Sequence, residues 1–313
     1  MWFIAQRLSQ KFLSCVKFSR MKAALFGKRI DKTNVGRLLL FVNNLKEFRH
    51  VEFCYHRQFY ELIEELGGKL PQGELFTCYE DLQHDIDIFL SLGGDGTFLE
   101  SLTMVRDRQI PIAGINFGRL GFLTTACVED NNPWIEKLIN GDYAIEDRAL
   151  LHLQKENLPE DFYPYALNEI SIQRMNPSML EIEIVIDGQP LPKYWSDGIL
   201  VATATGSTAY SMSVGGPIVT PDSKVLIIAP ISPHNLNVRP LIVPHTSTVE
   251  ISFQGRHPYA HFTVDNRSFN LKAGEKVVIS KGEFPIKSVS INNNFIAALN
   301  QKLLWGEDKR NMQ

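Results

Sequence analysis

Cysteine is scarce in this sequence and is never clustered. The 313 residues contain four cysteines, and the closest two, Cys54 and Cys78, are 24 positions apart. A zinc or redox motif of the C-x-x-C type is therefore excluded, because its two thiols lie close together in sequence. Scattered cysteines in a chain of this length are typical of reduced core residues in a cytosolic protein, so we expect a cytoplasmic location.

Long apolar runs and a strong excess of charge are also missing. No run approaches the roughly 18 apolar residues of a membrane-spanning helix, so we expect no membrane partner. The chain has 32 Lys and Arg against 35 Asp and Glu, a net charge of −3. A near-neutral chain lacks the wide basic surface that binds nucleic acid, so we expect no nucleic-acid partner. The 44% hydrophobic and 21% charged residues indicate a globular protein rather than a disordered chain, a collagen or a coiled coil.

Acidic residues are absent from the first 20 positions, which contain four basic ones. A basic, acid-free start resembles a targeting peptide. An upstream start codon would produce the same feature, with the protein itself beginning at Met21. We favour the second interpretation, because residues 22–27 already have the pattern of a buried strand. We therefore treat residues 1–20 as an extension outside the fold, which is either unstructured or the result of an upstream start codon.

Strands and helices alternate between residues 21 and 146. Short apolar runs predict strands, and apolar residues at helical spacing predict helices. The predicted strands are residues 23–27, 86–92 and 110–115, and the predicted helices are residues 52–66, 98–105 and 132–139. This strand–turn–helix–strand order predicts a parallel α/β sheet. Two domains are also the default expectation for this length, at roughly 100–200 residues per domain.

Residues 147–292 are dominated by short strand candidates. These are residues 150–153, 166–173, 180–186, 199–203, 225–228, 249–253, 262–265, 276–280 and 286–291. Several of them alternate polar and apolar side chains, and Asp187-Gly188 predicts a tight hairpin turn. The pattern predicts an antiparallel sandwich of two sheets, with the domain boundary near residue 147. A closing helix is predicted at residues 295–304.

The most informative short motif is Gly93-Gly94-Asp95-Gly96-Thr97, between a predicted strand and a predicted helix. Thr97 and Glu100 fit a capping box, with Thr97 as the N-cap. A glycine-rich helix start of this kind exposes backbone N–H groups and partial positive charge, which suits a phosphate. Asp95 would repel that phosphate unless it acts on a hydroxyl or a metal. The alternative is that Asp95 is an ordinary turn residue.

Two further stretches carry polar groups suited to a nucleotide. Residues 203–216, shortly after Asp197-Gly198, are rich in hydroxyl and small side chains, and Tyr210 offers an aromatic face for a purine. The alternative is a capped turn rich in serine and threonine. Asn168-Glu169 lies within a predicted strand, where an acidic residue could bind a ribose diol or could simply face solvent.

Together these strings resemble the NAD kinase family over roughly residues 21–310. The matching strings occupy residues 93–97, 114–116, 118–123, 168–169, 196–198, 205–211, 215–217 and 302–306. The resemblance implies an N-terminal Rossmann-like α/β domain followed by a C-terminal β-sandwich, with the last helix returning to the first domain. Residues 21–146 together with 293–313 would form the α/β domain, and residues 147–292 the NAD-binding sandwich.

The resemblance also implies a reaction and its site. The family transfers the γ-phosphoryl group of ATP to the 2′-hydroxyl of the adenosine ribose of NAD, giving NADP. Asp95 fills the position of the general base. The implied ATP-phosphate residues are Gly93, Gly94, Gly96 and Thr97. The implied NAD-binding residues are Asp95, Gly96, Phe122, Asn168, Glu169, Asp197, Thr208, Ala209, Tyr210, Ser213 and Arg267.

The implied partners are the substrates NAD and ATP and further copies of this chain. A divalent metal, Mg²⁺, would accompany ATP without a set of protein ligands of its own, and no prosthetic group is expected. We expect a homo-oligomer, either a dimer or a tetramer, in which Asp197 and residues 208–213 reach the site of a neighbouring subunit.

The sequence departs from the family pattern at three places, and two other classes of function remain open: another kinase of similar sequence, and a non-catalytic regulator. Trp195 stands where some members have Arg, Ala204 replaces a frequent Pro, and Asp265-Asn266-Arg267 replaces Asp-Gly-Gln. Lipid kinases share the glycine-rich string but lack the block around Tyr210, and phosphofructokinases have a similar string in a different frame. A non-catalytic nucleotide-binding regulator could dispense with Asp95, whose presence favours an enzyme.

Overall fold

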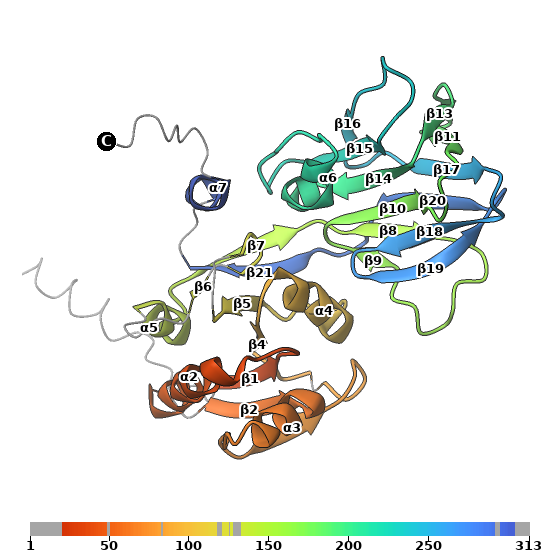
Figure 1. Ribbon diagram of the computed structural model, residues 1–313. Helices are drawn as coiled ribbons and strands as arrows, with labels where there is room; N and C mark the ends of the chain where they lie inside the picture. The colour runs from red at the N-terminus through yellow and green to blue at the C-terminus, as the bar shows by residue number, and fades with distance from the viewer. Residues whose placement is uncertain are drawn as a thin grey trace, which may run out of the picture.

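The computed structural model describes residues 21–48, 51–82, 84–117, 121–124, 126–127, 133–291 and 295–303. The predicted extension at residues 1–20 and parts of the motifs at residues 118–123 and 302–306 lie outside these ranges. Figure 1 shows a mixed α/β domain built from the early part of the chain and a sheet-rich domain built from the later part. The α/β and β-sandwich architecture predicted from the sequence is confirmed.

An eight-stranded sheet forms the first domain, in the order β3-β2-β1-β4-β5-β21-β7, with β6 paired to β5. The strands are β1 (Met21–Phe26), β2 (Val51–His56), β3 (Gly73–Phe76), β4 (Ile88–Leu92), β5 (Ile112–Asn116), β6 (Ala126–Cys127), β7 (Ala144–Arg148) and β21 (Ile286–Ser290). All pairs are parallel except β21 with β7. The chain winds outward in both directions from β1 and β4, so a crevice is expected at the carboxyl ends of these two strands.

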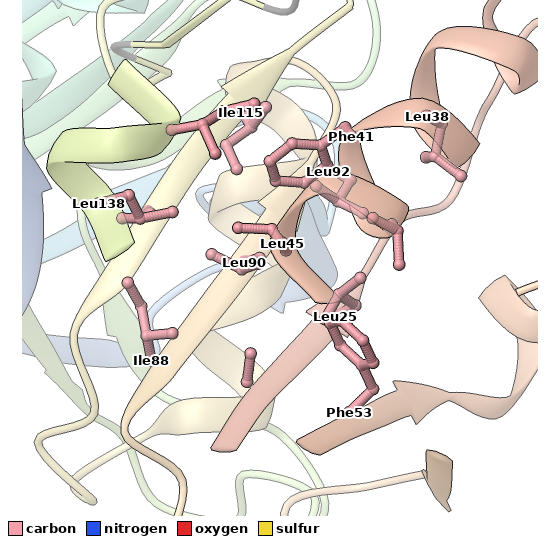
Figure 2. Close-up of a cluster of buried hydrophobic side chains, with 14 of the residues drawn as sticks. Leu25, Leu38, Phe41, Leu45, Phe53, Ile88, Leu90, Leu92, Ile115 and Leu138 are labelled. Atoms are coloured by element: carbon pink, nitrogen blue, oxygen red, sulfur yellow. The ribbon is translucent and has the colours of Figure 1, made fainter. Parts of the chain in front are cut away.

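Helices cover both faces of this sheet. The helices α2 (Val35–Phe48), α3 (Arg57–Glu65) and α5 (Pro133–Asn140) pack on one face, and α4 (Asp95–Val105) packs on the other. The alternation of side chains along a strand produces this division. Leu25 of β1 belongs to the cluster that includes Phe41 of α2 (Figure 2), whereas Phe26 belongs to the cluster that includes Phe98 of α4. A single 3₁₀ turn, η1 (Lys32–Asn34), precedes α2.

Two antiparallel sheets pack together in the second domain. One has the order β16-β15-β14-β10-β18-β19, and the other has the order β12-β11-β17-β20-β8-β9 with β13 beside β11. The strands are β8 (Leu151–Gln154), β9 (Tyr165–Ala166), β10 (Glu169–Arg174), β11 (Leu180–Ile186), β12 (Gln189–Pro190), β13 (Tyr194–Ser196), β14 (Gly198–Thr203), β15 (Val225–Ile231), β16 (Leu241–Pro244), β17 (Val249–Gln254), β18 (Tyr259–Val264), β19 (Arg267–Lys272) and β20 (Lys276–Lys281). Alternate side chains such as Ile172, Ile184, Phe253 and Phe262 fill the space between the sheets.

The predicted helix at residues 52–66 is wrong in its first part. Residues up to His56 form strand β2, and the helix α3 begins only at Arg57. Strand β2 lies inside the sheet, so Phe53 and Cys54 are buried on opposite faces of it. A strand buried on both faces has no polar alternation, and its apolar residues also fit a helical spacing. The helix α2 and the strand β3 have no counterpart among the predicted elements.

The strand predicted at residues 286–291 does not belong to the sandwich. As β21 it pairs with β5 and β7 in the α/β sheet, so the chain returns to the first domain at Ile286 rather than after residue 292. Figure 1 shows β7 and β21 side by side where the chain passes between the two domains. The closing helix α7 (Phe295–Leu303) follows, close to its predicted position.

Candidate active site

The glycine-rich motif forms the junction between β4 and α4. Gly94 is the N-cap and Asp95 the first residue of the helix. The predicted capping box is therefore wrong, because the N–H groups of Thr97 and Phe98 already donate to the Gly94 carbonyl inside the helix. The Glu100 carboxylate instead accepts hydrogen bonds from Lys28, at 2.8 Å, and from Asn266, at 3.4 Å.

The glycines of this turn differ in how much space a side chain would have at each position. Gly93 has a φ of 154°, and a Cβ there would lie 2.4 Å from the Thr97 hydroxyl oxygen, so a larger residue is excluded. A Cβ at Gly94 or Gly96 would meet no described atom within 4 Å. This side of the turn is open, and the first N–H groups of a helix have no acceptor within the helix. The arrangement suits an anion, as the predicted phosphate role of Gly93, Gly94, Gly96 and Thr97 requires.

The Asp95 carboxylate is held by the turn at residues 121–124. Its Oδ2 accepts the Phe122 N–H at 2.9 Å. Its Oδ1 accepts the N–H groups of Leu123 and Thr124, both at 3.1 Å, and the Thr124 hydroxyl at 3.2 Å. A Cβ at Gly121 would lie only 1.8 Å from Oδ1, so glycine allows this close approach. Four donors fix the orientation of a side chain that is still 34% exposed.

The closing helix α7 adds a cation to this carboxylate. Lys302 Nζ lies 3.7 Å from Asp95 Oδ2 and 4.1 Å from the centre of the Phe122 ring. The Phe295 ring packs 6.4 Å from the same phenyl ring. Burial lowers the pKa of Lys302, and the charge of Asp95 opposes this shift. Sequence reasoning gave Lys302 no role, although it opens the last of the matching strings.

A second group of polar residues surrounds Glu169 at the start of β10. Burial, and to a lesser extent the charge of Asp265, raises the pKa of Glu169 to about 8, while a hydrogen bond from the Tyr210 N–H opposes the shift. Glu169 Oε2 is buried without a hydrogen-bond partner among the described residues. A buried oxygen of this kind is costly unless a ligand satisfies it, which fits the predicted contact with NAD.

Asp265 holds the backbone of residues 167–169 in place, a role that sequence reasoning missed. Its buried carboxylate accepts the N–H groups of residues 167–169 at 2.8, 2.9 and 3.2 Å. Burial raises the pKa of Asp265 against the influence of these amides and of Arg267, whose Nη2 lies 3.7 Å away. Arg267 also donates to the carbonyl oxygens of Tyr165 and Val264, at 2.6 and 3.2 Å. The hydrogen bonds described for Arg267 are thus all to protein oxygen atoms.

The hydroxyl-rich segment packs directly on Asn168. It forms a 3₁₀ turn, η2 (Thr205–Thr208), and a short helix, α6 (Tyr210–Ser213). A Cβ at Gly206 would lie 2.1 Å from the Asn168 carbonyl oxygen, and the Gly206 N–H donates to the Thr203 hydroxyl at 3.1 Å. Glycine therefore lets this segment reach the Asn168-Glu169 pair.

The remaining predicted NAD-binding residues lie around the same segment. Burial raises the pKa of Tyr210, with the charges of Glu169 and Asp197 adding to the shift, so these three groups share one neighbourhood. Asp197 forms an ion pair with Arg174 at 2.9 Å. The Thr208 hydroxyl donates to the Thr205 carbonyl at 3.4 Å, and Ser213 is exposed. Ala209 links the two short helices.

A common core joins the Asp95 turn to the Glu169 group. Leu167, directly before Asn168, belongs to the same buried cluster as Phe98 of α4 and Leu123 of the turn that holds Asp95. The packing of these three side chains brings both predicted halves of the site to the boundary between the domains.

Over the described ranges, no three His, Cys, Asp or Glu side chains gather closely enough to hold a metal ion. Likewise, none of the helices formed by the described residues is long and apolar enough to cross a membrane.

An α/β domain with an open, glycine-rich helix start at its switch point, followed by an antiparallel sandwich, defines a two-domain nucleotide-binding protein. The profile of the ATP-NAD kinase N-terminal domain matches residues 58–143, and that of the ATP-NAD kinase C-terminal domain matches residues 167–291. The chain is 37% identical to an NAD kinase of Flavobacterium psychrophilum over 298 residues, 93% of this chain and 100% of the relative. It is 39% identical to an NAD kinase of Cytophaga hutchinsonii over 293 residues, 92% and 99% of the two chains. The chain belongs to the NAD kinase family.

Solved structures agree in fold. A yeast NADH kinase complexed with NADH superimposes with a TM-score of 0.82 at 24% identity, over 94% of this chain and 90% of that one. An NAD kinase from Archaeoglobus fulgidus in complex with ATP gives a TM-score of 0.69 at 27% identity, over 91% and 99%.

Proposed function

We propose that this protein is an NAD kinase that transfers the γ-phosphoryl group of ATP to the 2′-hydroxyl of the adenosine ribose of NAD. Full-length similarity to NAD kinases supports the reaction. The observation that carries the proposal in this chain is the fixed Asp95 carboxylate, placed at the first residue of a helix whose open glycine turn suits phosphate.

Asp95 acts as the general base. The 2′-hydroxyl oxygen forms the new bond to the γ-phosphorus, and the hydroxyl proton passes to the Asp95 carboxylate. The bond from the γ-phosphorus to the β–γ bridging oxygen breaks, and ADP leaves with the electron pair. General-base help of this kind contributes about 10²–10⁴-fold, and positioning and charge neutralisation supply most of the rest.

The sandwich residues orient NAD for this transfer. Asn168 and the partly buried Glu169 bind the adenosine ribose, and Tyr210 faces the purine. Phe122, held beside Asp95 by its own N–H, adds a second aromatic face. The other proposed NAD contacts are Gly96, Asp197, Thr208, Ala209, Ser213 and Arg267.

A divalent metal fits this site only as part of a complex with ATP. Mg²⁺ usually keeps several waters and binds through one or two carboxylates together with substrate phosphates. The described residues supply no cluster that could hold the ion alone, and Asp95 is the carboxylate nearest the phosphate turn. The metal would neutralise charge on the donor phosphates, while Gly93, Gly94, Gly96 and Thr97 bind them through backbone groups.

We further propose a homo-oligomer, a dimer or a tetramer, located in the cytoplasm. Exposed apolar side chains on the sandwich give this proposal some support, since such groups suit a subunit interface. They include Trp195, Leu236, Leu241 and Ile242.

An end-point assay tests the function. Purified protein is incubated with ATP, Mg²⁺ and NAD, and NADP is measured with a strictly NADP-dependent dehydrogenase. Product above a heat-inactivated control is expected. A folded sample that forms none would contradict the proposal, and phosphorylation of a sphingoid base in place of NAD would indicate a lipid kinase instead.

A further inference from the structure

The Tyr163 ring lies at the boundary between the two domains, next to arginines from both. It is carried by the loop before β9 and is only 7% exposed. The guanidinium carbon of Arg106, directly after α4, lies 5.7 Å from the centre of the ring, and that of Arg267, the first residue of β19, lies 5.1 Å from it. A cation within about 6 Å of an aromatic ring centre can be attracted to its face. One ring therefore connects α4 of the α/β domain with β19 of the sandwich.

The aromatic ring of Tyr163, rather than its hydroxyl, makes this connection. The hydroxyl oxygen is buried without a hydrogen-bond partner among the described residues. Burial raises the pKa of Tyr163, so the ring stays uncharged beside the two cations. The ring also belongs to the buried cluster that includes Phe98 of α4 and Leu167. Phenylalanine would therefore replace Tyr163 with little loss of contact, whereas an aliphatic residue would remove the attraction to the arginines.

The end of α4 holds Arg106 in a defined place. Arg106 is the C-cap, with a φ of 48°, and its N–H donates to the Leu102 carbonyl at 2.8 Å. Its Nε donates to the Thr103 carbonyl at 3.2 Å, and its guanidinium carbon lies 4.6 Å from the centre of the Tyr79 ring. A positive φ is unfavourable for a residue other than glycine, so the surrounding contacts must stabilise it. Because Asp95 is the first residue of the same helix, the place of Arg106 is tied to that of the proposed base.

Arg267 continues the connection to the backbone of the proposed NAD-binding pair. Its Nη2 lies 3.7 Å from Asp265 Oδ2 and donates to the Tyr165 carbonyl at 2.6 Å. The Asp265 carboxylate is 0% exposed and accepts the N–H groups of residues 167–169. Arg267 is also one of the departures from the family pattern, in which an uncharged Gln is found at this position. The contacts thus extend from the end of α4 to the residues that we propose to bind the ribose.

We propose that Arg106 and Tyr163 are positioning residues, which hold α4, and with it the Asp95 carboxylate, in register with the NAD bound by the sandwich. This inference rests on the proposed kinase function. The two residues act through α4 and through the Arg267–Asp265 pair. Reacting atoms must lie about 3–3.5 Å apart, so a shift of about 1 Å between the domains would slow the transfer while the sandwich still binds NAD.

Steady-state kinetics test the positioning role. Tyr163→Leu and Arg106→Met are each expected to lower kcat for NADP formation about tenfold, while KM for NAD and for Mg-ATP changes less than about twofold. Because both residues belong to one connection, the double variant should lose no more than about threefold beyond either single variant. Tyr163→Phe and Arg106→Lys should keep most of kcat, since the ring and the cation remain. Arg37→Met, at an exposed position on α2, is the matched control. Native kcat in folded Tyr163→Leu and Arg106→Met, or losses that multiply in the double variant, would overturn the inference.

Hydrogen–deuterium exchange separates failure of this inference from failure of the function itself, because it needs no turnover. The amides of residues 167–169 should exchange at least about fivefold faster in Tyr163→Leu and Arg106→Met than in the native protein, and at the native rate in Tyr163→Phe. The amides of β2, inside the α/β sheet, are the reference for a general loss of stability.

The outcomes of the exchange experiment are distinct. Unchanged exchange at residues 167–169, or equally faster exchange in β2, would contradict the connection even in a protein that forms NADP. Faster exchange confined to residues 167–169, in a protein whose native form makes no NADP, would support the connection and contradict the NAD kinase assignment.

Discussion

Lys302 Nζ lies 3.7 Å from Asp95 Oδ2, although 207 positions separate the two residues in sequence. The closing helix therefore supplies a cation to the carboxylate that we propose as the base. The same ammonium group covers the Phe122 ring at 4.1 Å, so it also fixes the turn whose N–H groups hold Asp95.

Replacing this cation is expected to affect catalysis more than binding. Lys302→Met should lower kcat about tenfold, because the carboxylate loses its neighbouring charge and the turn loses a contact, while KM for NAD changes little. Steady-state kinetics measure the split. Lys302→Arg should restore part of kcat, whereas equal losses in both variants would indicate a role in packing alone.

The tight contact between Gly121 and the Asp95 carboxylate predicts that one added methyl group at position 121 lowers kcat strongly. Gly121→Ala would force the turn away from Asp95, since its Cβ would lie 1.8 Å from Oδ1. We expect kcat to fall about a hundredfold, the size of loss that a misplacement of about 1 Å can cause. Gly36→Ala is the control, because a Cβ there meets no described atom within 4 Å. A fully active Gly121→Ala enzyme would show that the observed Asp95 geometry is dispensable.

The buried carboxyl of Glu169 predicts a pH-dependent stability. Its folded pKa of about 8 lies above the ordinary glutamate value of 4.5, so its contribution to stability is fully present below about pH 4.5 and is lost as the pH rises through about 8. Glu169→Gln cannot ionise, and its Tm relative to the native protein should therefore rise between pH 5 and about 9. Glu47→Gln on α2 is the control. A Tm difference that does not change with pH would contradict the assignment.

The segment packed on Asn168 should control NAD binding. Gly206→Ala places a Cβ 2.1 Å from the Asn168 carbonyl oxygen and must push the two segments apart. We expect the Kd for NAD to rise at least about tenfold in a titration, with a smaller change in KM for ATP. Unaltered NAD affinity in a folded variant would remove this contact from the binding site.

Short sequence motifs predicted those parts of the candidate site whose residues are close in sequence. Packing between distant segments determines the other contacts. The glycine motif could be recognised because strand, turn and helix are consecutive there, and the phosphate role that we propose for it is based on backbone geometry. The exact start of α4 could not, because Gly94 accepts the first helical hydrogen bonds without the expected side-chain cap. Lys302 and Asp265 were missed because their partners are distant in sequence, and nothing local marks a Lys or an Asp for such a contact.

The same reasoning explains why β2 was predicted as part of a helix and why β21 was assigned to the wrong sheet. Phe53 and Tyr55 are buried on one face of β2 and Cys54 and His56 on the other. Burial on both faces is a pattern that strands inside a parallel sheet share with buried helices. Ile286 and its neighbours alternate like the sandwich strands before them, but their position between β5 and β7 depends on the chain returning to the first domain. A local pattern identifies a strand without saying which sheet it joins.

The kinetic effect of Asp95→Asn tests the central claim most directly. Asparagine keeps the shape of the side chain and removes the proton acceptor, so we expect kcat for NADP formation to fall at least about a hundredfold, with the Kd for NAD within about threefold of the native value. A correctly folded Asp95→Asn enzyme with native kcat would show that another group takes the proton.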